Sequence, residues 1–134
     1  MQSPLQSTRV IHLRSRAGIR AAIHHILRAR GHDPSLIDPW YFPSADEYKA
    51  LLEHQGFDVQ SSSLHPRLTP LSKSGLRGWL DLFGRKTFLE SFNDVEADQI
   101  MSEVEEMCGI DLKDSKGNWT VVYVRLRFAA IKRI

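Results

Sequence analysis

The end of the chain carries the clearest pattern of hydrophobic and polar positions. Residues 118–130 alternate between two faces, and the apolar face is formed by Val122, Val124, Leu126 and Phe128. The opposite face carries Val121, Tyr123 and two arginines, Arg125 and Arg127. A period of two in β-branched and aromatic residues predicts a β-strand. Because its apolar face must be covered and a long strand needs strand partners, this strand is expected to organise the fold.

Two stretches in the first half of the chain have the apolar spacing of amphipathic helices. The first lies between residues 15 and 30 and is expected to end at Gly31. The second begins at a capping box formed by Ser44 and Glu47, in which each side chain closes one part of the first turn. Gly56 stands where this second helix is expected to end.

The second half of the chain adds one strand and two helices before the final strand. Residues 57–64 are predicted to form the strand, which Pro66 and Pro70 are expected to end because proline cannot donate to a strand ladder. A short amphipathic helix is predicted over residues 76–83. A longer, acidic helix is predicted to begin after a second capping-box residue, Asn93.

The order of these elements predicts an α/β chain with several helices and few strands. Residues 1–14 contain Pro4 and several polar residues, and they are predicted to be poorly ordered. A very short strand from Val10 to Leu13 is the weaker alternative. Residues 15–134 are predicted to form a single domain, since this length suffices for one modest core.

The composition is that of an ordinary globular protein, with 42% hydrophobic and 25% charged residues. A net charge of +2 is too small to imply a nucleic-acid partner, and no apolar run is long enough to span a membrane. Cys108 is the only cysteine, so a reducing cytoplasmic setting is the simplest interpretation. Residues 1–32 contain six arginines and no acid, which leaves a mitochondrial targeting peptide as the minor alternative.

The sequence supports no catalytic, cofactor-binding or metal-binding residue on its own. His24 and His25 are adjacent, so on a helix they diverge and cannot share one metal ion. Cys108 lies near the end of an acidic helix, where the pKa of its thiol is expected to be raised. The eight glycines are scattered, and none forms a phosphate-binding or dinucleotide-binding loop.

The chain from residue 38 onward resembles the C-terminal half of a class I S-adenosylmethionine-dependent methyltransferase. The nearest likeness is to the small-molecule branch related to trans-aconitate methyltransferases. The motifs that carry it are DPWYFPS (38–44), YKALLE (48–53), GFDV (56–59), RLTPL (67–71), GLRGWL (75–80), GNWT (117–120) and YVRLRF (123–128). With a similar helix over residues 17–31, the resemblance covers about residues 17–132.

The resemblance implies where the two predicted strands belong. The sheet of this family has seven strands, of which the last two form an antiparallel hairpin at one edge. Residues 57–64 are similar to the sixth strand and residues 119–131 to the seventh, which inserts between the fifth and the sixth. The predicted fold is therefore an incomplete α/β fold of four to five helices with an antiparallel C-terminal strand pair. It is equivalent to the last part of a Rossmann-like methyltransferase sheet, with the helices as a cap over the substrate side.

The resemblance also implies S-adenosylmethionine as cofactor, but the part of the family fold that binds it has no counterpart in this chain. A glycine-rich turn after the first strand and an acidic residue ending the second strand hold the methyl donor, and neither occurs here. The chain is therefore interpreted as a methyltransferase that lacks its cofactor half and is inactive alone. The alternative is a non-catalytic remnant that serves as an interaction or oligomerisation module.

The resemblance places four residues toward the substrate, namely Trp40, Tyr41, Arg77 and Trp79. An arginine with aromatic side chains suits a carboxylated or planar small molecule, such as a secondary metabolite. The opposing interpretation is that Tyr41 and Trp79 are packing residues of the core. Self-association or pairing through residues 119–128 is also predicted, because strand edges invite further strands. Nucleic-acid binding by the arginines is the weakest alternative.

Overall fold

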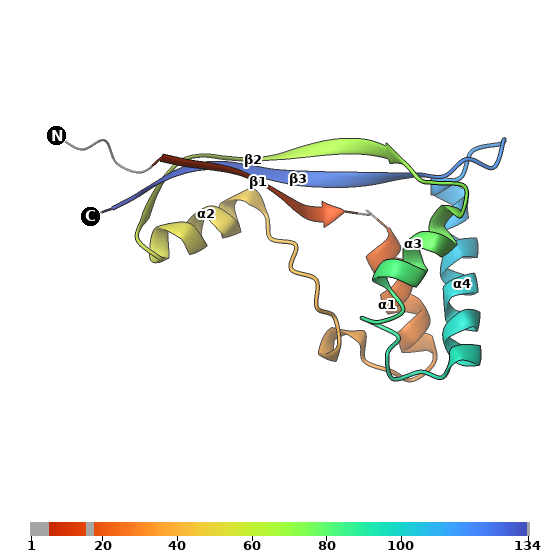
Figure 1. The fold of residues 1–134 in the computed structure, drawn as a ribbon. Helices are drawn as coiled ribbons and strands as arrows, with labels where there is room; N and C mark the ends of the chain where they lie inside the picture. Colours follow the sequence, from red (N-terminus) through yellow and green to blue (C-terminus); the bar gives the residue numbers. More distant parts are fainter. Residues whose placement is uncertain (1–5, 16–17, 134) are drawn as a thin grey trace. The chain divides into compact units, whose positions relative to one another are not determined.

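The computed structural model describes residues 6–15 and 18–133 of the chain. Its elements are β1 (Gln6–Ser15), α1 (Ile19–Ala29), the short 3-10 helix η1 (Pro34–Leu36), α2 (Ala45–His54), β2 (Phe57–Pro70), α3 (Gly75–Phe83), α4 (Asp94–Leu112) and β3 (Thr120–Lys132) (Figure 1). This set of four α-helices and a small antiparallel sheet confirms the predicted incomplete α/β fold. No helix in the described part of the chain combines the length and the apolar character that a membrane span requires.

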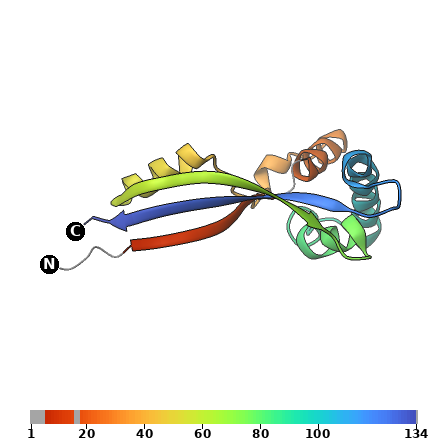
Figure 2. The ribbon, with the colours of Figure 1, turned by 90° about the horizontal axis from the view of Figure 1, so that it is seen from above.

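The three strands form one sheet in the order β1-β3-β2, so that the C-terminal strand lies in the middle (Figure 2). β1 is antiparallel to β3, with Gln6 opposite Ile131 and His12 opposite Arg125. β2 is antiparallel to β3 as well, because the Arg133 N–H donates to the Gly56 carbonyl (2.8 Å) at one end of the pair, and the Leu71 N–H donates to the Trp119 carbonyl (2.9 Å) at the other. The long C-terminal strand therefore has a partner on each side, as its pattern required.

β1 differs from the prediction, which gave residues 1–14 no regular structure. The structure forms a strand over Gln6–Ser15. Its partner, β3, lies more than a hundred residues away, so no local window of the sequence contains the pairing that makes these residues a strand. The predicted domain boundary after residue 14 is a separate matter and stays a prediction.

β2 is longer than predicted, because Pro66 does not end it and the strand continues to Pro70. The reason is that β2 is an edge strand, where an N–H on the outer side is not needed for the ladder. The Leu71 N–H points inward to β3, and since successive N–H groups alternate, the nitrogen of Pro70 lies on the outer side. The sequence pattern alone did not show which side of β2 was free.

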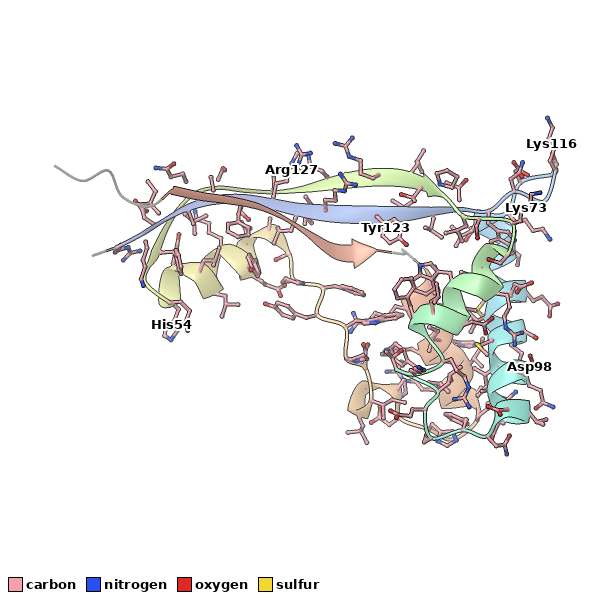
Figure 3. All side chains as sticks on the ribbon, in the orientation of Figure 1. His54, Lys73, Asp98, Lys116, Tyr123 and Arg127 are labelled. Atoms are coloured by element: carbon pink, nitrogen blue, oxygen red, sulfur yellow. The ribbon has the colours of Figure 1, made fainter. Side chains whose placement is uncertain are left out.

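The chain divides into two compact units. The first comprises β1, the residues Tyr41–Arg67 and the part of β3 from Val122 onward. In this unit α2 lies along one face of the sheet, where Val59, Phe128 and Ala130 are buried beneath Tyr48 and its neighbours. The rings of Tyr48 and Phe128 lie 5.4 Å apart, and Figure 3 shows Arg127 on the face away from α2.

The second unit comprises α1 through Trp40 together with Leu68–Val121. α1 and α3 both pack against α4, and the helices share a core of fully or almost fully buried side chains that includes Ile19, Leu27, Leu76, Leu80, Phe88, Ile100 and Val104. Val121 is also buried, although the alternation had placed it on the polar face of the last strand. This difference arises because Val121 belongs to the second unit, whereas the strand from Val122 onward belongs to the first.

Gly75 begins α3 with a φ of +61°, and a Cβ built there would lie 2.6 Å from Cδ1 of Trp119. We expect Gly75→Ala to lower the free energy of unfolding by about 2 kcal/mol, since it combines a left-handed backbone with a steric overlap. Urea unfolding followed by tryptophan fluorescence measures this loss.

The matched control is Gly117→Ala. Gly117 also has a positive φ, +84°, but the nearest atom to its Cβ position is Cε of Lys113 at 3.9 Å. Only the backbone cost of about 1 kcal/mol applies there. Equal losses for the two variants would contradict the close approach of Trp119 to Gly75.

Candidate functional site

Asp38 is the centre of a buried polar cluster in the second unit. Its side chain is only 4% exposed. Oδ2 accepts hydrogen bonds from Nε of Arg20 at 2.6 Å and from Nε2 of His24 at 2.8 Å. Oδ1 accepts from the Trp40 backbone N–H at 2.9 Å. Both oxygens of the carboxylate are thus engaged, as a buried charge requires.

Local geometry brings these groups together. Arg20 and His24 are four residues apart on α1, so their side chains lie on the same face of the helix. Asp38 precedes Pro39, which has no N–H, and its carboxylate therefore reaches the next available N–H, that of Trp40. This local turn orients the carboxylate, and α1 supplies its other two partners, Arg20 and His24.

The hydrogen bonds decide the ionisation state of Asp38. Burial by itself disfavours the charged carboxylate, but the Trp40 N–H, Arg20 and His24 outweigh it and hold the pKa of Asp38 below its usual range. Because an ionised carboxylate only accepts, Nε2 of His24 must carry the hydrogen in their shared bond. Nδ1 is then the nitrogen of a neutral His24 that can accept a proton.

An aromatic wall adjoins this cluster. The Trp40 ring meets the Phe88 ring edge-on at 4.8 Å between centroids and the Trp79 ring at 5.9 Å. Phe88 also contacts the His24 imidazole, with centroids 5.8 Å apart. Trp79 and Phe88 are buried, so the wall is held rigidly by the core of the second unit.

A cationic hollow of about 470 Å³ opens beside the cluster on α1. It is lined by Arg20, Ala21, His24, His25 and Arg28. Two acids interact with residues of its lining: Asp38 is bound to Arg20 and His24, and the pKa of Asp33 is lowered by hydrogen bonds from Ser35 and, to a smaller extent, by the charge of Arg28. Among the residues that line this hollow, Arg28 supplies a guanidinium that can hold a carboxylate or a similar anion.

The structure brings together two of the four residues predicted to face the substrate, Trp40 and Trp79. Arg77 is engaged elsewhere: it forms ion pairs with Asp98 of α4 and Asp81 of α3, and Asp98, labelled in Figure 3, raises its pKa. Tyr41 belongs to the first unit, where about half of its side chain is exposed. A role in substrate binding stays a prediction for all four.

The sequence alone did not identify Arg20, His24 and Asp38 as one site. The only local signals were the i, i+4 spacing of Arg20 and His24 and the aspartate before a proline. Their meeting depends on how residues 30–38 lead back to α1, which no spacing rule predicts. Among the described residues, no group of three or more His, Cys, Asp or Glu side chains is arranged to hold a metal ion.

The Cys108 thiol is buried in α4, away from this cluster. Burial, with a smaller contribution from the charge of Asp111, raises its pKa to about 11. This confirms the predicted direction, although burial contributes more than the acidic neighbours from which the prediction was made. At neutral pH the sulfur is a poor nucleophile.

Comparison with known proteins adds one relationship. No family model matches the chain. The chain is 37% identical over 114 residues to a Schizosaccharomyces pombe protein named as an uncharacterized methyltransferase. The match includes 83% of this chain but 43% of the relative, so the chain spans less than half of the length of that protein. The similarity supports a relationship to methyltransferases, while the class I and trans-aconitate-like branch stays a prediction.

Proposed function

We propose that these residues form the substrate-side part of an S-adenosylmethionine-dependent methyltransferase that acts on a small molecule. The observation that carries this proposal is the similarity of 83% of the chain to a protein named as a methyltransferase. The class I, trans-aconitate-like motifs of the sequence support the same assignment. The cluster around Asp38, with its aromatic wall and cationic hollow, offers a built surface for the acceptor.

The described residues do not fit the methyl donor. The sequence between β1 and α1 contains one glycine, Gly18, rather than a glycine-rich run. Each described neighbour in the sheet is antiparallel, so no adjacent parallel strand offers an acidic residue for a ribose. We therefore assign donor binding to residues outside this chain, and we expect the chain alone to be inactive.

In this proposal the residues of the second unit bind and orient the acceptor. Trp40 supplies an aromatic surface for a planar group, and Arg28 in the cationic hollow pairs with a carboxylate. Asp38 fixes the orientation of His24, which lines the same hollow. In this proposal Nδ1 of His24, the ring nitrogen that is not bonded to Asp38, takes the proton that an acceptor hydroxyl or carboxylic acid loses when its oxygen is methylated.

A chimeric protein tests the proposal. This chain replaces the matching region of the Schizosaccharomyces pombe relative, and methyl transfer from labelled S-adenosylmethionine is measured on a panel of small carboxylates and hydroxyl compounds. We expect transfer, and a loss of at least about 100-fold in His24→Gln, as is usual when an acid-base group is removed. Arg67→Gln, on the edge strand β2, is the control and should leave transfer unchanged. A chimera that binds the donor but modifies no small molecule would contradict the proposal.

Calorimetric titration of S-adenosylhomocysteine into the 134-residue chain tests the assignment of the donor site. We expect no binding heat from a folded sample. Heat that saturates at one site per chain would instead place a donor site within these residues and overturn that assignment.

A second proposal is that the chain serves as a pairing module through its sheet. β3 lies between β1 and β2, so pairing through residues 119–128 would require displacement of a neighbour or use of an outer edge. In the described sheet, the outer edges of β1 and β2 have no further strand partner, and such edges accept strands from other chains. A monomeric mass at high concentration in gel filtration would count against this module.

A further inference from the structure

A groove follows the seam between α1 and α4 in the second unit. Two hollows of about 610 and 290 Å³ lie along this seam, and both are lined by His25 and Met107. Together they extend from Gly18 and Leu112 at one end to Arg30 and Glu103 at the other, which are joined by an ion pair of 3.1 Å. The two helices are therefore antiparallel, and the groove is about 16 Å long, the length of α1.

An exposed apolar side chain stands at this groove. Ile110 lines the larger hollow and is 84% exposed, and Met107 beside it is 39% exposed. Across the groove, α1 presents the small side chains of Ala21 and Ala29, which leave space above them. The same surface thus contains an exposed apolar side chain, Ile110, and a hollow above small side chains that is able to accept such a group from another molecule.

The two sides of the groove carry opposite charges. α1 contributes the guanidinium of Arg30 and the imidazole of His25, which can donate a hydrogen bond to a carboxylate, whereas α4 contributes the carboxylates of Glu103, Glu106 and Asp111. Arg30 already pairs with Glu103 and, at 3.6 Å, with Glu96. Within residues 18–133, Glu106 and Asp111 have no ion-pair partner, so their carboxylates can pair with a cationic group of another molecule.

We propose that this groove is an isologous interface that binds a second copy of the chain. A two-fold axis parallel to the groove lays α1 of each copy along α4 of the other, in antiparallel orientation. The basic side of one copy then faces the acidic side of the other, and each Ile110 enters the part of the groove above Ala21 and Ala22. A two-fold axis across the groove would instead place like charges together, so the charge pattern selects the first arrangement.

This arrangement differs from pairing of strands because it uses side chains of two helices and leaves the sheet untouched. It does not use the residues of the Asp38 cluster or the aromatic wall, although Ala21 and His25 line both the groove and the cationic hollow. Opposite charges should make the association dependent on salt, and burial of Ile110 should supply most of its strength.

Sedimentation equilibrium of the full chain tests the proposal. We expect a concentration-dependent dimer that weakens as salt rises, and a dissociation constant raised at least about 30-fold by Ile110→Asp. Leu82→Asp is the matched control, because Leu82 is 74% exposed on α3 and does not line the groove. Circular dichroism confirms that each variant is folded, as both substitutions fall on exposed positions.

Charge exchange gives a second test of the same geometry. His25 and Glu106 line the same hollow, so the proposed axis sets His25 of one copy opposite Glu106 of the other. Glu106→Arg and His25→Glu should each weaken self-association, whereas an equimolar mixture of the two variants should associate more tightly than either alone. Failure of the mixture to recover association would contradict the proposed axis.

Two outcomes overturn the proposal. One is a wild-type chain that remains monomeric at the highest concentration measured. The other is a dimer that survives Ile110→Asp but is lost in Leu68→Pro. Leu68 is 78% exposed, and by alternation from Leu71 its N–H lies on the outer edge of β2, so this variant blocks edge pairing while it keeps the ladder to β3.

Discussion

Phe88→Ala is expected to cause the largest loss of stability in the second unit, about 4 kcal/mol in the free energy of unfolding. Phe88 is fully buried, and its ring touches both Trp40 and His24. Removal of the ring leaves a cavity where the aromatic wall meets the polar cluster, and close packing prevents the surroundings from filling it. Because small domains are only marginally stable, such a loss is a large part of the total.

Urea unfolding measured by tryptophan fluorescence is suited to this variant, since Trp40 and Trp79 both report on the wall. Phe83→Ala is the control: Phe83 also contacts Trp79, at 5.1 Å, but about half of its side chain is exposed. We expect it to lose about 1 kcal/mol. If the two variants lose the same amount, Phe88 does not have the central packing role that the structure gives it.

Asp38→Ala is expected to lower the free energy of unfolding by about 3 kcal/mol. The substitution removes the shared acceptor of Arg20, His24 and the Trp40 N–H, and the buried donors lose their partners. Arg20 is 40% exposed and recovers some hydration, so the loss is below that of a fully buried pair. Asp38→Asn, which keeps an oxygen for the Trp40 N–H, should lose less.

The same carboxylate predicts a dependence on pH. The pKa of Asp38 in the folded protein is lowered below its ordinary value of 3.8, so its contribution to stability is fully present above that value. The contribution is lost as the pH falls through the lower, folded-state pKa. Urea unfolding from pH 7 down to pH 2 should therefore show a steeper acid loss for the wild type than for Asp38→Asn.

Asp33→Asn is the control for both effects. Asp33 is an exposed carboxylate whose pKa is also lowered, by hydrogen bonds from Ser35, but it holds no buried donor. Its replacement should cost far less stability at neutral pH than Asp38→Ala does, as is usual for surface positions. If Asp33→Asn lowers the free energy of unfolding as much as Asp38→Ala does, the buried hydrogen bonds of Asp38 are not the reason for the loss in Asp38→Ala.

The sequence by itself determined the features that depend on neighbours a few residues apart. Both capping residues act as predicted: Ser44 Oγ accepts from the Glu47 N–H at 3.1 Å, and Asn93 Oδ1 accepts from the Glu96 N–H at 2.8 Å. Gly31 and Gly56 have the positive φ expected just after α1 and α2. The alternation of residues 118–130 likewise predicted β3, because a period of two is a local property.

Only the tertiary structure decided which distant groups meet. Asp38 gathers Arg20 and His24 from α1, and Arg77 is neutralised by Asp98, although 21 residues separate that pair. β1 becomes a strand because β3 pairs with it, and Pro66 is tolerated because β2 is an edge strand. Caps, turns and periodicity depend on residues that are only a few positions apart in the sequence. Ion pairs and strand partners are chosen by packing, which joins residues that no sequence window contains together.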